Sequence, residues 1–328
     1  MKCINNKKRM AAAVLLMLFL STGCGEPITI DNPYDVYESP RAYGLNITVS
    51  SESNQSFFAK DLCVPGTEDL LSQNITASLS EAAGLFDIQT NTMKFGKNIH
   101  GRVYPASTTK ILTAYVALKH GDLSATTMVT EQELQLEDGS STCGLSVGDT
   151  ISLEELLYGL MLCSGNDAAN VIADLVAGST EKFANMMNEE ALALGATKSH
   201  FINPHGLHSE EHYTTVYDMY LIFQAALQNE KFVQIISSKN HTASFTNSAG
   251  AASLEWANTN KYLNGEAEIP EGIQVIGGKT GTTNDAGYCL VLYSKNNSGS
   301  PFISIVYKSD SRENLYYEMT ELLMESGK

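Results

Sequence analysis

The sequence predicts a mixed α/β fold of the α+β kind, in which an antiparallel five-stranded sheet packs on helices and an inserted helical subdomain interrupts the strands. Strand-like segments lie at the two ends of the folded region, whereas helical patterns fill the middle. The chain has 328 residues, of which 43% are hydrophobic and 18% charged. This length and balance suit a large globular core and exclude wholesale disorder and a coiled-coil rod.

The N-terminus has the features of an export signal. Four cationic residues precede an apolar run at 10–20, which is too short to span a membrane as a helix. Small residues then lead to Cys24, an arrangement similar to a bacterial lipobox. We therefore expect a signal peptide at 1–23 and a lipid on Cys24. Ordinary cleavage that leaves Cys24 free is the alternative.

Charge limits the partners of the exported chain. The formal net charge is −16, and removal of the cationic signal makes the chain more acidic. Nucleic-acid binding is not expected, because phosphate affinity depends on Lys and Arg. Anionic lipid head groups would also repel the protein, so we expect membrane attachment through the lipid anchor alone. Residues 24–71 are expected to form a tether and N-terminal extension, since 25–56 are rich in Pro, Ser, Asn and Asp.

Local patterns place each element of the folded region. The first two strands are expected at 76–87 and 94–95, with turn residues between them. Helices are expected at 107–120, 153–162, 167–176, 180–194 and 214–227. The chain then returns to strands at 273–279, 286–294 and 302–308. A closing helix is expected from about residue 312, which gives a domain at 72–312 and a C-terminal helix at 313–328.

The first chemical motif is Ser107-x-x-Lys110, at the start of an expected helix. Side chains three apart share a helix face, so Lys110 can reach the Ser107 hydroxyl, and free N–H groups at a helix start suit an oxyanion. Lysine becomes a base only when burial or a second cation lowers its pKa. The spacing alone is ambiguous. Ser179 and Lys182 share it, and there we interpret Ser179 or Thr180 as a helix cap. A surface lysine at a helix start is the alternative for Lys110.

The second motif, Ser164-x-Asn166, lies in a tight turn between two expected helices. Ser164 could relay protons between Lys110 and a leaving group, and Asn166 could hold a substrate amide. The same pattern occurs at 72–74, 238–240 and 294–296, where loops are expected. The alternative is that Ser164 caps a helix and Asn166 serves the turn.

The third motif, Lys279-Thr280-Gly281-Thr282, closes an expected strand. Lys279 would supply the second cation, and Thr280 and Thr282 could bind a carboxylate. Glycines let a substrate backbone approach the strand edge. A glycine-rich hairpin with an exposed lysine is the alternative.

Together and in this order, the three motifs resemble the set shared by class A β-lactamases and penicillin-binding proteins. From about residue 74 to 310 the chain is similar to D-alanyl-D-alanine carboxypeptidases of the low-molecular-mass penicillin-binding protein family. The segments that carry the similarity are 104–114, 164–168, 201–207, 258–261, 278–283 and 286–288.

The resemblance implies a β-lactamase/DD-peptidase-like fold and a serine mechanism in a catalytic domain at 72–312. Ser107 would attack the bond between the last two D-alanines of a peptidoglycan stem peptide, with Lys110 as base. Ser164 and Lys279 would complete the proton and charge network, and the N–H groups of Ser107 and Thr282 the oxyanion hole. It implies no cofactor or metal, and covalent inhibition by β-lactams at the same serine.

The resemblance also bears on location. We expect the protein at the outer face of the cytoplasmic membrane. The β-rich C-terminal stalk of many relatives is expected to be absent, and a lipid on Cys24 would replace its anchoring role. Oligomeric state is left open.

Parts of the sequence also suggest three other functions. A class A β-lactamase would need a Glu in a Glu-x-x-Leu-Asn context, and none lies between 166 and 279. A metalloprotease could use the His208-x-x-Glu-His212 pattern, but the flanking Pro204 and Gly206 favour a loop with solvated histidines. A β-lactam sensor or wall-binding module is the non-enzymatic alternative, and the intact serine and lysines argue against it.

The remaining cysteines leave their pairing open. Cys63, Cys143, Cys163 and Cys289 allow three full pairings. For Cys163 and Cys289, burial as small apolar side chains is favoured over a bridge between them.

Overall fold

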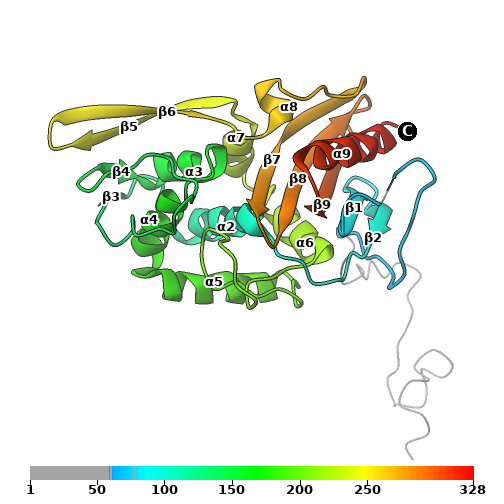
Figure 1. Cartoon of the computed structure of the whole chain (residues 1–328), viewed down its shortest axis with the longest axis horizontal. Helices are drawn as coiled ribbons and strands as arrows, with labels where there is room; N and C mark the ends of the chain where they lie inside the picture. The colour runs from blue at the N-terminus through cyan, green and yellow to red at the C-terminus, as the bar shows by residue number, and fades with distance from the viewer. Residues whose placement is uncertain (1–58, 60, 77) are drawn as a thin grey trace, which may run out of the picture. The chain divides into compact units, whose positions relative to one another are not determined.

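The structure is a computed structural model that describes residues 59, 61–76 and 78–328 (Figure 1). These residues belong to one compact unit. The expected signal peptide, Cys24 and most of the expected tether lie outside the described residues. Among the residues that are described, no helix combines the length and apolar character needed to cross a membrane.

A five-stranded antiparallel sheet forms the centre of the unit, as predicted. Its order is β2-β1-β9-β8-β7. The strands are β1 (Ala82–Asp87), β2 (Thr92–Lys97), β7 (Ile273–Thr283), β8 (Gly287–Asn296) and β9 (Pro301–Ser309). The first strand begins at 82, not at 76 as predicted, because side chains of α9 (Arg312–Ser326) hold the preceding residues: Thr76 bonds Glu321, and Ser80 bonds Glu318.

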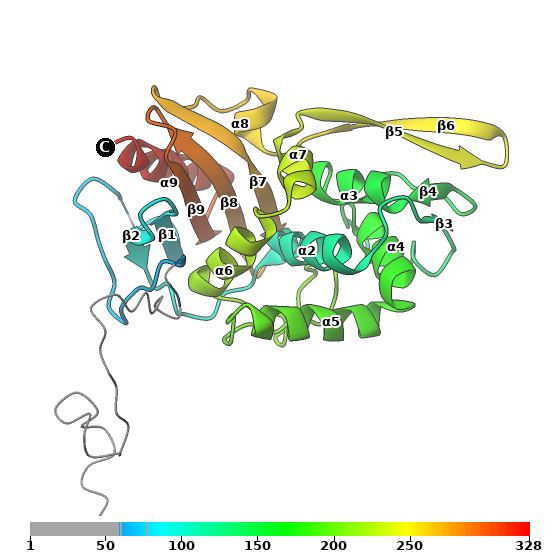
Figure 2. The same cartoon turned by 180° about the vertical axis from the view of Figure 1, so that it is seen from behind.

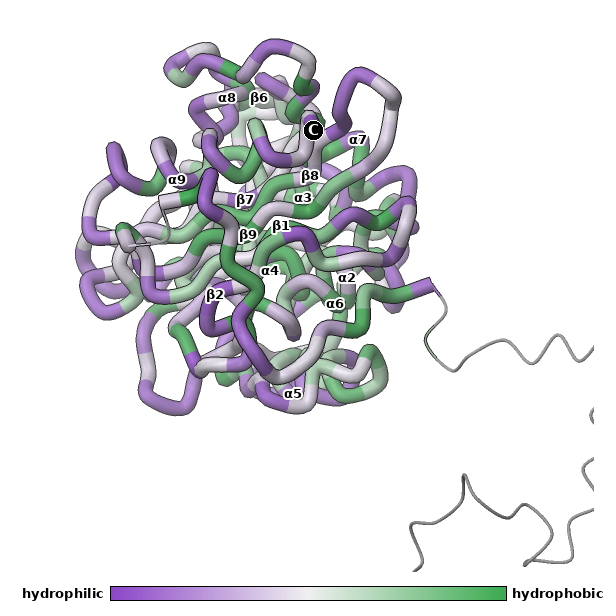
Figure 3. The backbone as a smooth tube through the Cα atoms, turned by 90° about the vertical axis from the view of Figure 1, so that its right-hand side faces the viewer, coloured by the Kyte–Doolittle hydropathy of each residue, from purple (hydrophilic) through white to green (hydrophobic). Residues whose placement is uncertain are grey.

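Both faces of this sheet are covered. Alternate residues of a strand point to opposite faces. Leu85 and the other apolar residues on its face of the sheet pack against Leu315 and Met319 of α9. Phe86, on the opposite face, points into the larger core beneath the helices. Figures 1 and 2 show α9 on one side of the sheet and α2 and α6 on the other. Apolar residues run along the central strands, and hydrophilic residues gather in the outer loops (Figure 3).

The helices expected in the middle of the chain are present with small shifts at their ends. They are α2 (Lys110–His120), α3 (Leu153–Leu162), α4 (Asn166–Ala177), α5 (Thr180–Ala193) and α6 (Val216–Ala226). Ser179 caps α5, as predicted for the second Ser-x-x-Lys pattern, by accepting the Lys182 N–H at 3.1 Å. Two short helices were not predicted, α7 (Glu230–Ser237) and α8 (Lys261–Asn264).

A second sheet was also not predicted. Its order is β3-β4-β5-β6, built from β3 (Thr126–Met128), β4 (Thr150–Ser152), β5 (Asn240–Asn247) and β6 (Gly250–Ala257). The β5–β6 hairpin extends alongside α3 and β4 (Figures 1 and 2). Trp256 of β6 donates its indole N–H to the Cys143 carbonyl at 2.8 Å. The sheet therefore supports the loop that precedes β4.

Residues before position 72 belong to the same unit as the domain expected at 72–312. Cys63 is fully buried, and its N–H donates to the Tyr220 hydroxyl at 2.8 Å. Leu70 forms an isolated antiparallel bridge with Gly96 of β2. At the other end of the chain, α9 covers one face of the sheet.

Candidate active site

The Ser107 hydroxyl is presented by a 3₁₀ turn, η1 (Ala106–Thr109), and α2 begins only at Lys110. The sequence predicted a regular helix from Ser107, so its start was wrong by three residues. Pro105 has no N–H to donate, and its carbonyl accepts both the N–H and the hydroxyl of Thr108, at 3.1 and 2.7 Å. These bonds tighten the turn into the 3₁₀ form.

Lys110 lies at the centre of the site and is fully buried. Its Nζ is 3.0 Å from Ser107 Oγ, 2.7 Å from Asn166 Oδ1 and 2.8 Å from the His205 carbonyl oxygen. The last two atoms are acceptors only. A neutral amine therefore directs its two hydrogens to them and its lone pair to the Ser107 hydroxyl. The alternative of a surface lysine is wrong.

Electrostatics favour that neutral amine. Burial, followed by the positive charge of Lys279, lowers the pKa of Lys110 well below its ordinary value, and the Asp167 carboxylate opposes the shift. Asp167 is held by the loop between β3 and β4, where its carboxylate accepts the N–H groups of Cys143, Gly144 and Leu145. Asp167 is buried beside the site, and its role was not predicted from the sequence.

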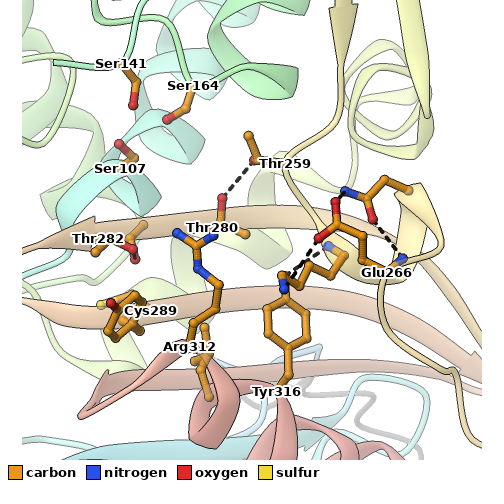
Figure 4. Close-up of a pocket in the computed structure, with 15 residues that line it drawn as sticks. Ser107, Ser141, Ser164, Thr259, Glu266, Thr280, Thr282, Cys289, Arg312 and Tyr316 are labelled. Atoms are coloured by element: carbon orange, nitrogen blue, oxygen red, sulfur yellow. Dashed lines mark hydrogen bonds and ion pairs between the residues drawn. The ribbon is translucent and has the colours of Figure 1, made fainter. Parts of the chain in front are cut away.

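The Ser164 turn brings the second motif to the same place. Ser164 takes a left-handed backbone conformation, with φ of 62°, between α3 and α4. It does not cap α4, because the N-cap is Gly165. The Ser107, Ser141 and Ser164 side chains converge at one end of the site (Figure 4). Asn166 is anchored by its N–H, which donates to the Ser141 carbonyl at 2.8 Å.

The third motif lies on β7, the edge strand of the five-stranded sheet. Burial lowers the pKa of Lys279 to about 7, and the side chain is only 1% exposed, so the alternative of an exposed lysine is wrong. Thr280 shares a hydroxyl–hydroxyl bond of 2.9 Å with Thr259. A Cβ built on Gly281 would lie 3.0 Å from both Pro105 O and the Ser107 backbone nitrogen. Glycine at 281 therefore lets β7 approach the Ser107 turn.

These groups border a pocket of about 330 Å³. The pocket is lined by residues that the sequence motifs predicted to share one site: Ser107, Ser164, Thr280, Gly281 and Thr282. Lys110, Asn166 and Lys279 are buried beside it. The structure thus brings together all of the predicted site residues within its described range.

Other lining residues were not assigned a role from the sequence, notably Ser141, Tyr316 and Arg312. Arg312 opens α9 and was interpreted only as a helix start. Lys261 pairs with Glu266 at 3.4 Å, whereas no carboxylate within the described range is paired with Arg312. Figure 4 places the Arg312 guanidinium between the serines and the Glu266 end of the pocket. A cation in that position is available to an anionic ligand.

The two histidines of the metalloprotease pattern have different partners. His212 is buried, so the prediction of a solvated histidine is wrong for this residue, and its Nε2 lies 2.8 Å from Thr109 Oγ1. His208 lies 3.8 Å from the Asp285 carboxylate and stacks edge-on against Tyr104. Within the part of the chain that is described, no group of three or more His, Cys, Asp or Glu side chains is placed to hold a metal.

Comparisons with known proteins agree with this geometry. The sequence model of a family described as D-alanyl-D-alanine carboxypeptidase matches residues 71–311. D-alanyl-D-alanine carboxypeptidase DacF of Bacillus subtilis is 29% identical over 247 residues, which are 74% of this chain and 61% of that protein. The D-alanyl-D-alanine carboxypeptidase of Streptomyces sp. strain K15 is 32% identical over 234 residues, 68% of this chain and 78% of that protein.

A solved structure of a related protein is also similar to this one. The crystal structure of the Streptomyces K15 DD-transpeptidase has a TM-score of 0.70 to this structure at 30% identity, and covers 76% of this chain and 97% of that one. The chain spans 61% of the length of the Bacillus relative, so that relative has a substantial part with no counterpart in the match.

Proposed function

This chain belongs to the D-alanyl-D-alanine carboxypeptidase family, and we propose that it is a serine-type D-Ala-D-Ala carboxypeptidase that works through an acyl-enzyme on Ser107. One observation carries the proposal. The fully buried Lys110 Nζ lies 3.0 Å from Ser107 Oγ, and burial and a second cation lower its pKa. A neutral lysine in hydrogen-bond contact is what a serine needs to become a nucleophile.

In the first step, Ser107 Oγ attacks the carbonyl carbon between the two terminal D-alanines, and Lys110 accepts its proton. The backbone N–H groups of Ser107 and Thr282 stabilise the oxyanion. The close approach of β7 to the turn at Gly281, which a Cβ would obstruct at 3.0 Å, supports this arrangement.

The C–N bond then breaks and D-alanine leaves with the proton, which Ser164 relays from Lys110 to the leaving amine. Ser164 faces Ser107 across the end of the pocket (Figure 4). Water afterwards hydrolyses the ester and frees Ser107 with the shortened peptide.

Two sets of groups would hold the substrate. Asn166 uses its Oδ1 for Lys110, so its Nδ2 is free to donate to a carbonyl on the acyl side. Lys279, Thr280, Thr282 and the Arg312 guanidinium would bind the terminal carboxylate of the leaving D-alanine. The mixture of cation and hydroxyl groups along one wall of the pocket supports this assignment.

A β-lactam would acylate the same serine and leave slowly. In class A β-lactamases, rapid hydrolysis of the acyl-enzyme depends on a carboxylate that activates water. Among the described residues that line the pocket, Glu266 is the only carboxylate, and it is paired with Lys261. We therefore favour a peptidase that β-lactams inhibit over a class A β-lactamase.

We further propose that the protein is exported, acts on peptidoglycan outside the cytoplasmic membrane and is held there by a lipid on Cys24. The cationic and apolar segments before Cys24 support this. The catalytic domain would occupy 72–312, with the helix at 313–328 packed on its sheet, in keeping with the family match at 71–311. Replacement of Cys24 by Ala should remove the lipid and release the protein from the membrane fraction.

The catalytic proposal is tested by D-alanine release from a stem pentapeptide. The wild-type protein should release it, and Ser107→Ala should not. Ser179→Ala provides a matched control, because Ser179 belongs to the other Ser-x-x-Lys sequence and caps α5. Equal activity in the Ser107→Ala and wild-type proteins would refute the assignment.

A further inference from the structure

Cys143 and Cys163 lie together directly behind the Ser164 turn. Cys163 follows the last residue of α3, and its thiol donates to the Gly159 carbonyl at 3.1 Å. A Cβ built on Gly159 would lie 2.9 Å from Cys143 Sγ, and one built on Gly165 would lie 3.0 Å from it. Both thiols therefore pack against the last turn of α3, in a space that two glycines leave open.

The two thiols also interact with each other and differ in character. A side-chain hydrogen bond between them lowers the pKa of Cys163 and raises that of Cys143. Burial and the Asp167 carboxylate oppose the shift at Cys163, and the charge of Lys279 supports it, so that the pKa of Cys163 is lowered overall. Cys163 is half-buried, whereas Cys143 is 6% exposed. One thiol is therefore accessible and inclined to ionise, and the other is protected and protonated.

We propose that Cys143 and Cys163 form a redox-active dithiol, whose disulfide clamps the Ser164 turn onto the loop that carries Ser141. The structure holds the dithiol form, since all four cysteines in its described range are free. The oxidant is a small-molecule or protein disulfide, as expected on the oxidising side of a membrane.

The disulfide forms by two steps of thiol–disulfide exchange with the external disulfide. The Cys163 thiolate attacks one sulfur of the external disulfide, forms a mixed disulfide and expels one thiolate. Cys143 then loses its proton, attacks the Cys163 sulfur and expels the second thiolate. The two cysteines are oxidised to one disulfide, and the external disulfide is reduced to two thiols. The lower pKa and greater exposure of Cys163 assign it the attacking role and Cys143 the resolving role.

The segments to be joined are already fixed to each other. The Asn166 N–H donates to the Ser141 carbonyl at 2.8 Å, and the Cys143 N–H to the Asp167 carboxylate at 2.9 Å. The disulfide would therefore add a covalent link between two segments that are already hydrogen-bonded to each other. It would hold Cys163 in place beside the left-handed Ser164, and by restricting the unfolded chain it would stabilise the fold.

The chain contains a built-in probe of this change. Trp256 is its single tryptophan. The indole donates to the Cys143 carbonyl at 2.8 Å, and its ring atom Cη2 would lie 3.1 Å from a Cβ on Gly159. Formation of the disulfide in contact with this ring should quench its fluorescence.

The test is incubation of the purified protein with oxidised glutathione, followed by alkylation of free thiols, intact mass and peptide mapping. Relative to the reduced and alkylated protein, we expect two fewer alkyl groups, the loss of two hydrogens and one cross-link, Cys143 to Cys163. Tryptophan fluorescence should fall and Tm should rise by more than about 5 °C, and dithiothreitol should reverse both. None of these readouts depends on the catalytic proposal.

Two variants separate the roles of the thiols. Cys143→Ser should accumulate a stable glutathione adduct on Cys163, because nothing resolves it. Cys163→Ser should accumulate none, because Cys143 is protected. Cys63→Ser, which removes a fully buried thiol elsewhere, should form the cross-link as the wild type does.

Three results would overturn the proposal: no cross-link in the wild type, a cross-link that maps to another cysteine pair, or a fall in Tm on oxidation. An adduct in Cys163→Ser but not in Cys143→Ser would overturn the assigned roles. Mapping of the wild-type cross-link decides the matter even where a variant does not fold.

Discussion

A Cβ on Gly206 would lie 1.9 Å from the carbonyl oxygen of Ala106, so the loop that contains Gly206 rests directly on the turn that presents Ser107. Both residues have left-handed backbones, with φ of 91° at Gly206 and 47° at Ala106. The same loop supplies the His205 carbonyl to Lys110 and the Pro204 carbonyl to Thr113 at 2.6 Å. It therefore sets the position of the nucleophile and of its base together.

Gly206→Ala should accordingly be among the most damaging single changes. The added methyl group meets backbone that cannot move without displacing the turn, and we expect a loss of about 2–4 kcal/mol in the free energy of unfolding. Gly265→Ala is the matched control, because Gly265 has φ of 85° and open space around its Cβ. It should cost only about 1 kcal/mol. Urea titration measures both, and equal losses would show that steric contact with Ala106 is unimportant.

Gly281→Ala should impair acylation more than stability. The new Cβ would lie 3.0 Å from the Ser107 nitrogen, in the proposed oxyanion hole, and we expect about a tenfold or greater fall in the acylation rate by a fluorescent penicillin. Gly327→Ala has a comparably tight contact, 3.3 Å from Met324 O, but lies remote from the pocket. It should acylate normally. An unchanged rate in Gly281→Ala would contradict the proposed approach of β7 to the turn.

The acylation rate should show a bell-shaped pH dependence. Lys110 must be neutral to accept a proton, so the rate rises with pH through its lowered pKa. Lys279 must be charged to bind a carboxylate, so the rate falls as pH rises through a pKa near the value of about 7 for the free protein, or higher once an anion is bound. Because the Lys110 and Lys279 amines interact, the two pKa values seen in this profile describe the pair and not either lysine alone. The measurement is the second-order acylation rate between about pH 5 and pH 10.

Lys279→Arg separates the two limbs. Arginine stays protonated throughout this range, so the variant should be slower overall but should lose the alkaline limb. Retention of the same alkaline limb in Lys279→Arg would assign that limb to another group.

Buried neutral histidines should make the fold sensitive to acid. Burial lowers the pKa of both His205 and His212 to about 3, against an ordinary value of 6.5. The unfolded chain therefore binds more protons between these values, and the free energy of unfolding falls as pH drops through this range. His212→Gln can still donate to Thr109 but cannot titrate, so its stability should depend less steeply on pH. Equal slopes for the two proteins in chemical denaturation would argue against the buried neutral state.

The five-stranded sheet could be predicted because its strands carry enough apolar residues to mark them. Leu290 to Leu292 are buried on both sides of the sheet and form a continuous apolar run, and Ile303, Ile305 and Val306 are buried with Ser304 as the one polar residue among them. The second sheet has no such signal. Strands β3 and β4 have three residues each, and β5 and β6 are largely exposed. Their pairing depends on contacts distant in sequence, such as Trp256 with Cys143.

Likewise, only some of the site residues could be predicted from the sequence. Ser107, Lys110, Ser164 and Lys279 could be found because they lie in short motifs with fixed spacing. Ser141 and Arg312 reach the pocket from a loop and from the start of α9, where only the tertiary fold brings them close. The 3₁₀ form of the Ser107 turn likewise depends on tertiary support, since the loop around Gly206 holds Ala106 in its left-handed conformation.

The most direct test of the central claim is the intact mass of the protein after brief exposure to benzylpenicillin, with Ser107→Ala and Ser179→Ala measured in parallel. The account predicts a stable adduct of one penicillin that maps to Ser107, is absent from Ser107→Ala and is retained by Ser179→Ala. Unmodified protein beside intact drug would contradict a working acyl-serine site. Unmodified protein beside hydrolysed drug would instead show rapid deacylation and establish a β-lactamase.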